Sequence, residues 1–189
     1  AAKKKERRNL AFCRSGEYEG LDKISENKWK PDFGLAKFNK SVKKTGAIAV
    51  GARDFLVAYN INLNTTSTRR ANSIAFDIRE AGRIKRKGNK FTGEIVKDIN
   101  GEPLRVPGKL KEVKGIGWYI EEYGIAQISY NLTNISVTPV HIAFDETFNN
   151  ANSKGIRVTG SELVGLIPLK SMIDTADYFL KKQNRSLGI

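Results

Sequence analysis

The chain is predicted to adopt a mixed α/β fold of the α+β class, a ferredoxin-like split βαβ sandwich in the order β-α-β-β-α-β. An extra C-terminal helix and a basic hairpin insertion are expected in addition. Alternating apolar and polar residues indicate strands at 54–63, 111–121 and 124–133, and apolar residues three or four apart indicate helices between and after them. The 189 residues are 40% hydrophobic and 28% charged, which is typical of a chain that buries a core.

The first predicted strand and helix occupy 54–78. One face of the strand carries Phe55, Val57, Tyr59, Ile61 and Leu63, and the other face carries small or polar residues. The helix has one apolar stripe, formed by Ala71, Ile74, Ala75 and Ile78. Thr65 or Thr66 is the expected N-cap, and Gly82 the expected stop.

A basic excursion, 83–110, separates this helix from the next two strands. Asn100-Gly101 lies between two β-prone runs and predicts a hairpin, although Pro103 limits its second arm. The strands at 111–121 and 124–133 then follow, with a tight turn near Glu122–Gly124 between them.

The C-terminal part is predicted to be helix, short strand, loop and helix. Thr138 should cap a helix that begins at Pro139, ends at Gly155 and carries Val140, Phe144, Phe148 and Ala151 on its stripe. A strand at 156–160 leads into a loop at 160–169, where Glu162 is either an exposed carboxylate or one positioned at a subdomain edge. The final helix carries Met172, Ile173, Ala176, Phe179 and Leu180.

Helices of this kind cover one face of the sheet, so the other face is expected to be open unless something binds it. We expect that open face to carry Asn60, Asn62, Gln127, Ser129 and Asn131. Gly115, Gly117 and Tyr119 are predicted to face the same side, opposite Ile116, Trp118 and Ile120, so that the glycines leave a trough for a ligand. Solvated faces usually carry charged side chains, so the uncharged amides favour a binding surface.

Charge and cysteine content narrow the classes of partner. The formal net charge of +13 implies an anionic partner such as nucleic acid, an acidic membrane or a polyanionic metabolite. The single cysteine, Cys13, excludes an internal disulfide framework and indicates a reducing compartment, so we expect a cytoplasmic protein. No apolar run reaches the ~20 residues of a membrane span, and we expect neither membrane insertion nor a metal site.

Residues 114–120, KGIGWYI, begin like the RNA-binding octamer of the RNA-recognition module. The stretch lies on the second strand rather than the third, Ile116 replaces an aromatic residue, and Tyr59 belongs to the apolar set. A basic RNA-binding, RRM-like module is therefore the disfavoured alternative. The only histidine, His141, lies off the main stripe of its helix, which favours a structural role over a catalytic one.

Long blocks along the whole chain resemble the glutamate formimidoyltransferase family; they include RRNLAFCRSGEYEGL, GAIAVGARDFLVAYNINL, AQISYNLTNISVTPVH and GSELVGLIPLKSMIDTA. The resemblance implies two α/β subdomains with a basic folate-binding tunnel between them. It implies transfer of the formimino group from N-formimino-L-glutamate to tetrahydrofolate, which yields L-glutamate and 5-formiminotetrahydrofolate in histidine degradation. Formyl transfer between glutamate and tetrahydrofolate is the alternative, and the full enzyme is expected to be a homo-oligomer.

The same resemblance divides the chain. Residues 1–48 correspond to the end of an N-terminal subdomain and a linker, and 49–189 to the C-terminal subdomain. The family's catalytic histidine is expected to lie outside this chain, in an N-terminal subdomain that is largely missing here. The catalytic residue is thus unknown, and the chain alone should be inactive.

Folate contacts are expected from two segments. The family's folate-binding linker corresponds to 34–46, which implies contacts by Gly34, Lys37, Phe38, Lys40, Lys43, Lys44 and Gly46. The predicted open face adds Asn60, Asn62, Gly115, Gly117, Tyr119, Gln127 and Asn131, with Glu162 as an auxiliary carboxylate. Tetrahydrofolate, with one glutamate or a polyglutamate tail, is the expected co-substrate, with no metal.

Overall fold

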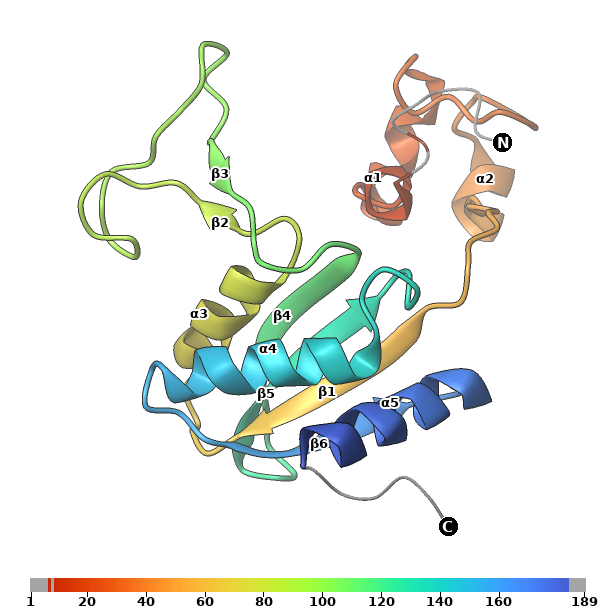
Figure 1. Cartoon of the computed structure of the whole chain (residues 1–189). Helices are drawn as coiled ribbons and strands as arrows, with labels where there is room; N and C mark the ends of the chain where they lie inside the picture. Colours follow the sequence, from red (N-terminus) through yellow and green to blue (C-terminus); the bar gives the residue numbers. More distant parts are fainter. Residues whose placement is uncertain (1–6, 8, 184–189) are drawn as a thin grey trace. The chain divides into compact units, whose positions relative to one another are not determined.

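The computed structural model describes residue 7 and residues 9–183, and it divides into two compact units, Ala1–Arg53 and Asp54–Ile189. In the first unit lie helix α1 (Leu10–Cys13), a 3-10 helix η2 (Glu19–Ser25) and helix α2 (Lys40–Thr45) (Figure 1). Phe12 and Trp29 stack with their ring centroids 5.2 Å apart.

Helix α2 has well-defined ends. The side-chain oxygen of Asn39 accepts a hydrogen bond from the Val42 N–H at 2.9 Å, and Gly46, with φ 74°, donates its N–H to the Val42 carbonyl. Val42 is buried, whereas Lys40, Lys43 and Lys44 are exposed. Because residues three and four apart share a helix face, these three lysines lie together, opposite Val42.

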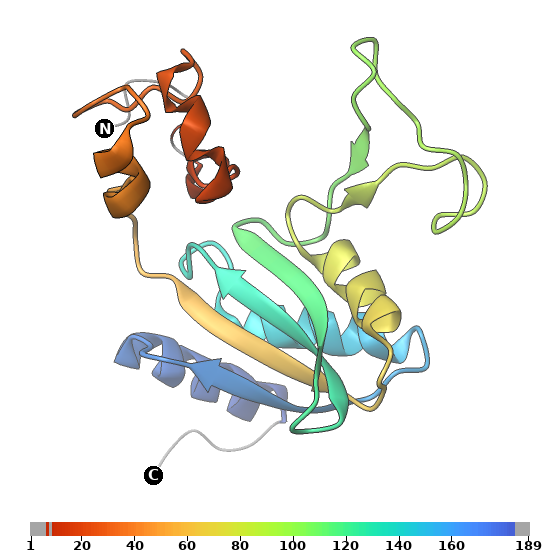
Figure 2. The same cartoon turned by 180° about the vertical axis from the view of Figure 1, so that it is seen from behind.

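The second unit contains a four-stranded antiparallel sheet in the order β4-β5-β1-β6. Its strands are β1 (Val57–Leu63), β4 (Val113–Ile120), β5 (Ile125–Leu132) and β6 (Val158–Val164). Helices α3 (Thr68–Ile78) and α4 (Val140–Asn152) pack on one side, and α5 (Leu169–Lys182) follows β6 (Figures 1 and 2). The predicted element order and the ferredoxin-like α+β class are confirmed.

The core lies between the sheet and helices α3 and α4. It contains the predicted apolar sets of β1, β5 and α3, including Val57, Tyr59, Ile61, Leu63, Ala126, Ile128, Tyr130, Leu132, Ala71, Ile74, Ala75 and Ile78. Phe55 was predicted to belong to this set and does not, because β1 begins only at Val57 and Phe55 is 78% exposed. The Tyr130 and Thr147 hydroxyls, both buried, lie 3.0 Å apart.

Several predicted boundaries are wrong by a few residues. The N-cap of α3 is Ser67, whose hydroxyl accepts from the Arg70 N–H, rather than Thr65 or Thr66. Thr138 does not cap α4, because its hydroxyl donates to the Lys111 carbonyl at 2.7 Å. Pro139 precedes the helix as its N-cap, with no side-chain cap hydrogen bond.

Only part of the apolar stripe predicted for α5 packs against the rest of the unit. Phe179 packs edge-on against Phe144 of α4, and Tyr178 stacks on His141 with ring centroids 4.6 Å apart. Met172, Ile173 and Leu180 are exposed. Among the described residues, no helix is long and apolar enough to cross a bilayer.

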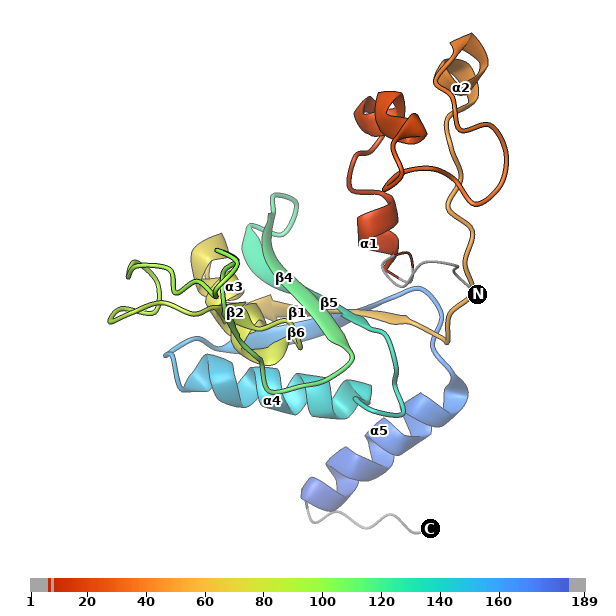
Figure 3. The same cartoon turned by 90° about the horizontal axis from the view of Figure 1, so that it is seen from above.

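The basic excursion forms a small, separate sheet. Strands β2 (Arg83–Ile84) and β3 (Arg105–Val106) pair antiparallel, and the connection runs out beyond α3 (Figure 3). The turn predicted at Asn100-Gly101 is present, since Gly101 has φ 80° and donates to the Asp98 carbonyl at 3.1 Å. Its arms are joined by an isolated antiparallel bridge at Lys97 and Pro103, in which the N–H groups of Asp98 and Leu104 donate across the hairpin.

Candidate functional site

The face of the sheet opposite α3 and α4 is the candidate site. None of the described helices of this unit covers it, and it is turned toward the viewer in Figure 2. Asn60, Asn62, Gln127 and Asn131 lie on this face, as predicted, because alternate residues of β1 and β5 are committed to the core. Tyr59 is on the core side and only 7% exposed, so it is unavailable for stacking RNA bases.

A hydrogen-bonded network crosses all four strands on this open face. The Trp118 indole N–H of β4 donates to Gln127 Oε1 of β5 at 2.9 Å. Gln127 Nε2 donates to Asn62 Oδ1 of β1 at 2.7 Å and to Glu162 Oε2 of β6 at 3.2 Å. Asn60 Nδ2 donates to the same Glu162 oxygen at 3.3 Å. We call Trp118, Gln127, Asn62, Glu162 and Asn60 the polar network.

The donors and acceptors of the polar network are fixed, because an indole N–H can only donate a hydrogen bond. Its donation fixes the Gln127 oxygen toward Trp118 and the Gln127 nitrogen toward Asn62 and Glu162. The carboxylate in turn requires the nitrogen of Asn60 on its side. Gln127 is 0% exposed although no described helix covers it, so the neighbouring polar side chains bury it.

The network leaves one acceptor unsatisfied. Asn60 is 5% exposed, and its Oδ1 has no hydrogen-bond partner among the described residues. An unpaired buried acceptor costs about 1–3 kcal/mol.

The predicted glycine trough is wrong. Gly115 and Gly117 face the helices: a Cβ on Gly117 would lie 2.5 Å from the Asn72 backbone nitrogen, and one on Gly115 would lie 2.6 Å from the Tyr130 ring. Asn72 of α3 binds Gly117 on both sides, accepting from its N–H at 2.9 Å and donating to its carbonyl at 3.1 Å. The glycines therefore let α3 approach β4 closely and leave no trough for a ligand.

Tyr119 shares the helix side with these glycines, and Ile116 and Trp118 take the open face instead. Sequence reasoning missed Trp118 in this role. The tight turn at Glu121–Gly124 sets a register in which Trp118 pairs with Gln127. Because Gln127 was already assigned to the open face, that register was the signal that would have placed Trp118 there.

Glu162 lies in a strand and not in the predicted loop. Strand β6 continues to Val164, and Glu162 pairs directly with Asn60. The irregular connection to α5 is limited to residues 165–168. The carboxylate is thus held on the open face by two amide donors.

The predicted linker contacts belong to the first unit. Gly34, Lys37 and Phe38 precede α2, and Gly46 ends it. The lysine face of α2, formed by Lys40, Lys43 and Lys44, concentrates positive charge that attracts anionic groups. The polar network belongs to the second unit.

His141 lies at the contact between α4 and α5. Its Nδ1 is 3.3 Å from the Thr175 hydroxyl. Burial lowers the pKa of His141 below the ordinary value of 6.5, although Asp174 and Asp145 act in the opposite direction. Within the described part of the chain, no three His, Cys, Asp or Glu side chains form a group suited to a metal ion.

Comparison with known proteins identifies related chains. Residues 58–188 match the model of the Formiminotransferase domain, and residues 1–53 match that of its N-terminal subdomain. Formimidoyltransferase-cyclodeaminase of Dictyostelium discoideum is 44% identical over 179 residues, 94% of this chain and 29% of that protein. The protein of the same name from Gallus gallus is 43% identical over 184 residues, 97% of this chain and 30% of that protein. Glutamate formimidoyltransferase of Thermoplasma acidophilum is 37% identical over 184 residues, which are 96% of this chain and 51% of that protein.

The strand order, with helices on one side, defines a ferredoxin-like α+β unit with one open, polar face. The chain belongs to the formiminotransferase domain family. It spans less than a third of the length of the cyclodeaminase relatives and about half of the glutamate formimidoyltransferase relative.

Proposed function

We propose that this chain is part of a folate-dependent transferase that moves the formimino group from N-formimino-L-glutamate to tetrahydrofolate, in histidine degradation. The observation that carries the proposal is the match to the formiminotransferase family over residues 58–188, together with relatives that are named for this activity. The full enzyme is proposed to be a cytoplasmic homo-oligomer. Residues 1–48 are proposed to be the end of an N-terminal subdomain and linker, and 49–189 the C-terminal subdomain.

The open face is proposed to bind folate. A pterin ring presents several donors and acceptors on one edge, and positioned amides match such an edge. The unsatisfied Asn60 acceptor and the Glu162 carboxylate supply acceptors here, and exposed Asn131 supplies an amide on the same face. Gly115, Gly117 and Tyr119 are not included, because they face the helices.

The lysine face of α2 is proposed to attract the glutamate tail of the folate, with Gly34, Lys37, Phe38 and Gly46 flanking it. Exposed charges act over about 8 Å at physiological ionic strength, so a longer polyglutamate tail should bind more tightly, and salt should reduce the gain.

The chemistry requires proton transfers and stabilisation of a tetrahedral intermediate when N5 attacks the formimino carbon. The chain's own contribution is proposed to be orientation of the folate, with Glu162 as an auxiliary carboxylate. A histidine of the N-terminal subdomain is proposed as the general acid and base. The isolated chain should therefore bind tetrahydrofolate without turnover.

Calorimetric titration of the chain with tetrahydrofolate tests the binding surface. Asn131→Ala should weaken binding by about 1 kcal/mol, or more if Asn131 bonds a buried ligand group, and leave the thermal midpoint unchanged. Asn149→Ala, an exposed asparagine on α4, is the matched control and should change neither. Equal folate affinity in all three proteins would place the folate elsewhere.

A transfer assay then tests the activity. The chain should be inactive alone with either N-formimino-L-glutamate or N-formyl-L-glutamate, and active with the formimino donor once an N-terminal subdomain of a relative is supplied. Turnover by the chain alone, or a preference for the formyl donor, would contradict the proposal.

A further inference from the structure

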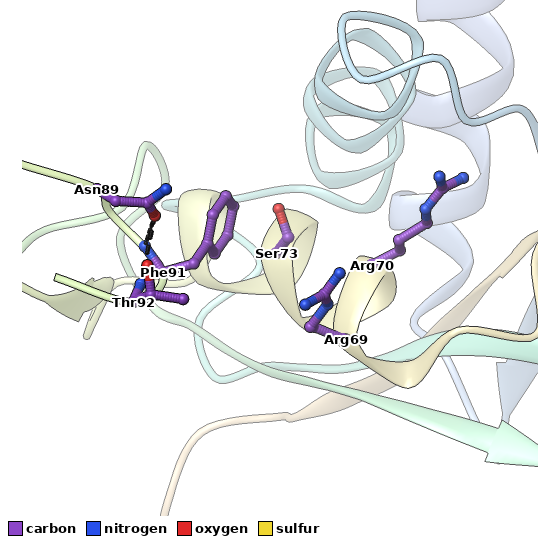
Figure 4. Close-up of a pocket in the computed structure, with 6 residues that line it drawn as sticks. All are labelled: Arg69, Arg70, Ser73, Asn89, Phe91 and Thr92. Atoms are coloured by element: carbon purple, nitrogen blue, oxygen red, sulfur yellow. Dashed lines mark hydrogen bonds between the residues drawn. The ribbon is translucent and has the colours of Figure 1, made fainter.

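A basic hollow lies between the beginning of α3 and residues 89–92 of the basic excursion, 83–110, which we call the insertion (Figure 4). It consists of two adjoining cavities of about 350 and 250 Å³. Arg70, Ser73 and Phe91 line both cavities, so the two form one continuous hollow. A ferredoxin-like core needs only a short connection between α3 and β4, so this insertion, and the hollow with it, is additional to the fold.

The lining of the hollow is strongly positive. Arg69, Arg70, Lys90 and Lys154 contribute to it, and no acidic side chain does among the described residues. Neither guanidinium of Arg69 and Arg70 has a hydrogen-bond or ion-pair partner in the described part of the chain. In Figure 4 the Arg69 side chain extends toward the loop that carries Phe91, and Arg70 extends away from that loop.

One nearby carboxylate compensates only part of this charge. Asp77 pairs with Lys154 at 2.6 Å and also with Arg83, so one negative charge faces two positive ones. Burial lowers the pKa of the Lys154 ammonium, Asp77 opposes that shift, and the positive charges of Arg83 and Lys90 add to it. The cations that line the hollow therefore repel one another, and a bound anion would relieve that repulsion.

An aromatic ring lines both cavities of the hollow. Phe91 is 47% exposed, and Figure 4 shows its ring beside Ser73. Asn89 Oδ1 holds the loop by accepting from the N–H groups of Phe91 at 2.8 Å and Thr92 at 3.3 Å. An exposed ring among cations suits a ligand that carries both a flat ring and negative charge, because rings stack and arginine donates in a forked geometry to phosphate.

We propose that this hollow binds a small phosphate-bearing ligand with an aromatic ring, that is, a nucleotide. Phe91 stacks on the ring, Arg69 contacts the phosphate nearest the ring, and Arg70, which extends away from the Phe91 loop, contacts the far end of the phosphate chain. The site is independent of the proposed folate surface, because α3 packs on the face of the sheet opposite the polar network. Phosphate is favoured over carboxylate as the bound group. Two unpaired guanidiniums offer more N–H donors than the two oxygens of one carboxylate can accept from.

Calorimetric titration of the whole chain with ATP and with inorganic pyrophosphate tests the proposal. Arg69→Gln combined with Arg70→Gln should weaken both ligands by about tenfold or more, since hydrogen bonds to charged groups are lost. Phe91→Leu should weaken ATP by about fivefold or more and leave pyrophosphate unchanged, since pyrophosphate has no ring. Unfolding curves should show that every variant remains folded.

The matched control is Lys85→Gln combined with Lys97→Gln. It also removes two positive charges, but from exposed positions of the insertion that do not line the hollow. This control should bind both ligands within about twofold of the original chain, as expected for distant exposed charges. Equal losses in the control would show that only net charge matters and would overturn the site.

Three other outcomes would also overturn it: no binding of ATP or pyrophosphate at millimolar concentration, tetraglutamate binding as tightly as ATP through the same arginines, or a single-stranded oligonucleotide binding through them while ATP does not.

Discussion

The two faces of the sheet are built by the same alternation and behave differently. The helix face of β4 carries glycines because the backbone of α3 approaches Gly117 and the buried ring of Tyr130 approaches Gly115. The open face contains Gln127, which is just as buried, yet its neighbours are polar and hydrogen-bonded in one direction. Burial alone does not distinguish the two faces. The difference is that close packing fills the helix face, whereas the open face retains an unused acceptor at Asn60.

The largest expected effect tests the helix face. Gly117→Ala places a Cβ 2.5 Å from the Asn72 backbone nitrogen, which cannot move without displacing α3. We expect the free energy of unfolding, measured with urea, to fall by about 3 kcal/mol.

The control for this change is Gly160→Ala, also in a strand, where an added Cβ meets only Asn62 Nδ2 at 3.9 Å. It should cost less than about 1 kcal/mol. Similar losses for the two variants would mean that strand glycines are equivalent and that the contrast between the faces is false.

A medium effect tests whether the open face also stabilises the fold. Gln127→Met keeps the size of the side chain and removes its hydrogen bonds to Trp118, Asn62 and Glu162. The free energy of unfolding should fall by about 2 kcal/mol, because the remaining groups are left partly unpaired. Ser129→Ala, on the same strand, should change it by less than about 0.5 kcal/mol. An unchanged free energy of unfolding in Gln127→Met would show that the polar network does not stabilise the fold.

The smallest effect concerns the helix side at α5 and depends on pH. His141 has a lowered pKa in the folded chain, so the unfolded chain, at the ordinary 6.5, binds a proton more readily. Stability should therefore fall as pH drops through 6.5 toward the lower folded value, and be fully present above that range.

His141→Gln should remove this part of the pH dependence while keeping a hydrogen bond within reach of Thr175. Urea unfolding at about pH 7.5 and about pH 5.5 measures it, since only histidine changes charge there in an unperturbed chain. An identical pH slope in the variant would assign the titration to another group.

Sequence reasoning predicted the element order and the open face of β1 and β5, because long strands that alternate cleanly reveal their faces. It failed on β4, since Gly115 and Gly117 have no side chain from which a face can be read. It missed the extension of β6 through Glu162, because the pairing with Asn60 is a long-range contact. The hollow around Phe91 was equally unpredictable, because it depends on how an irregular insertion folds back on α3.

The indole of Trp118 gives the open face an optical readout. Its emission responds to the hydrogen bond that its N–H donates to Gln127, and a ligand that reorganises the network would alter that bond. The second tryptophan, Trp29, stacks on Phe12 in the other unit. Trp29→Phe would keep an aromatic stack there and leave Trp118 as the only tryptophan of the chain. Selective excitation of tryptophan then makes occupancy of this face measurable in real time without a label.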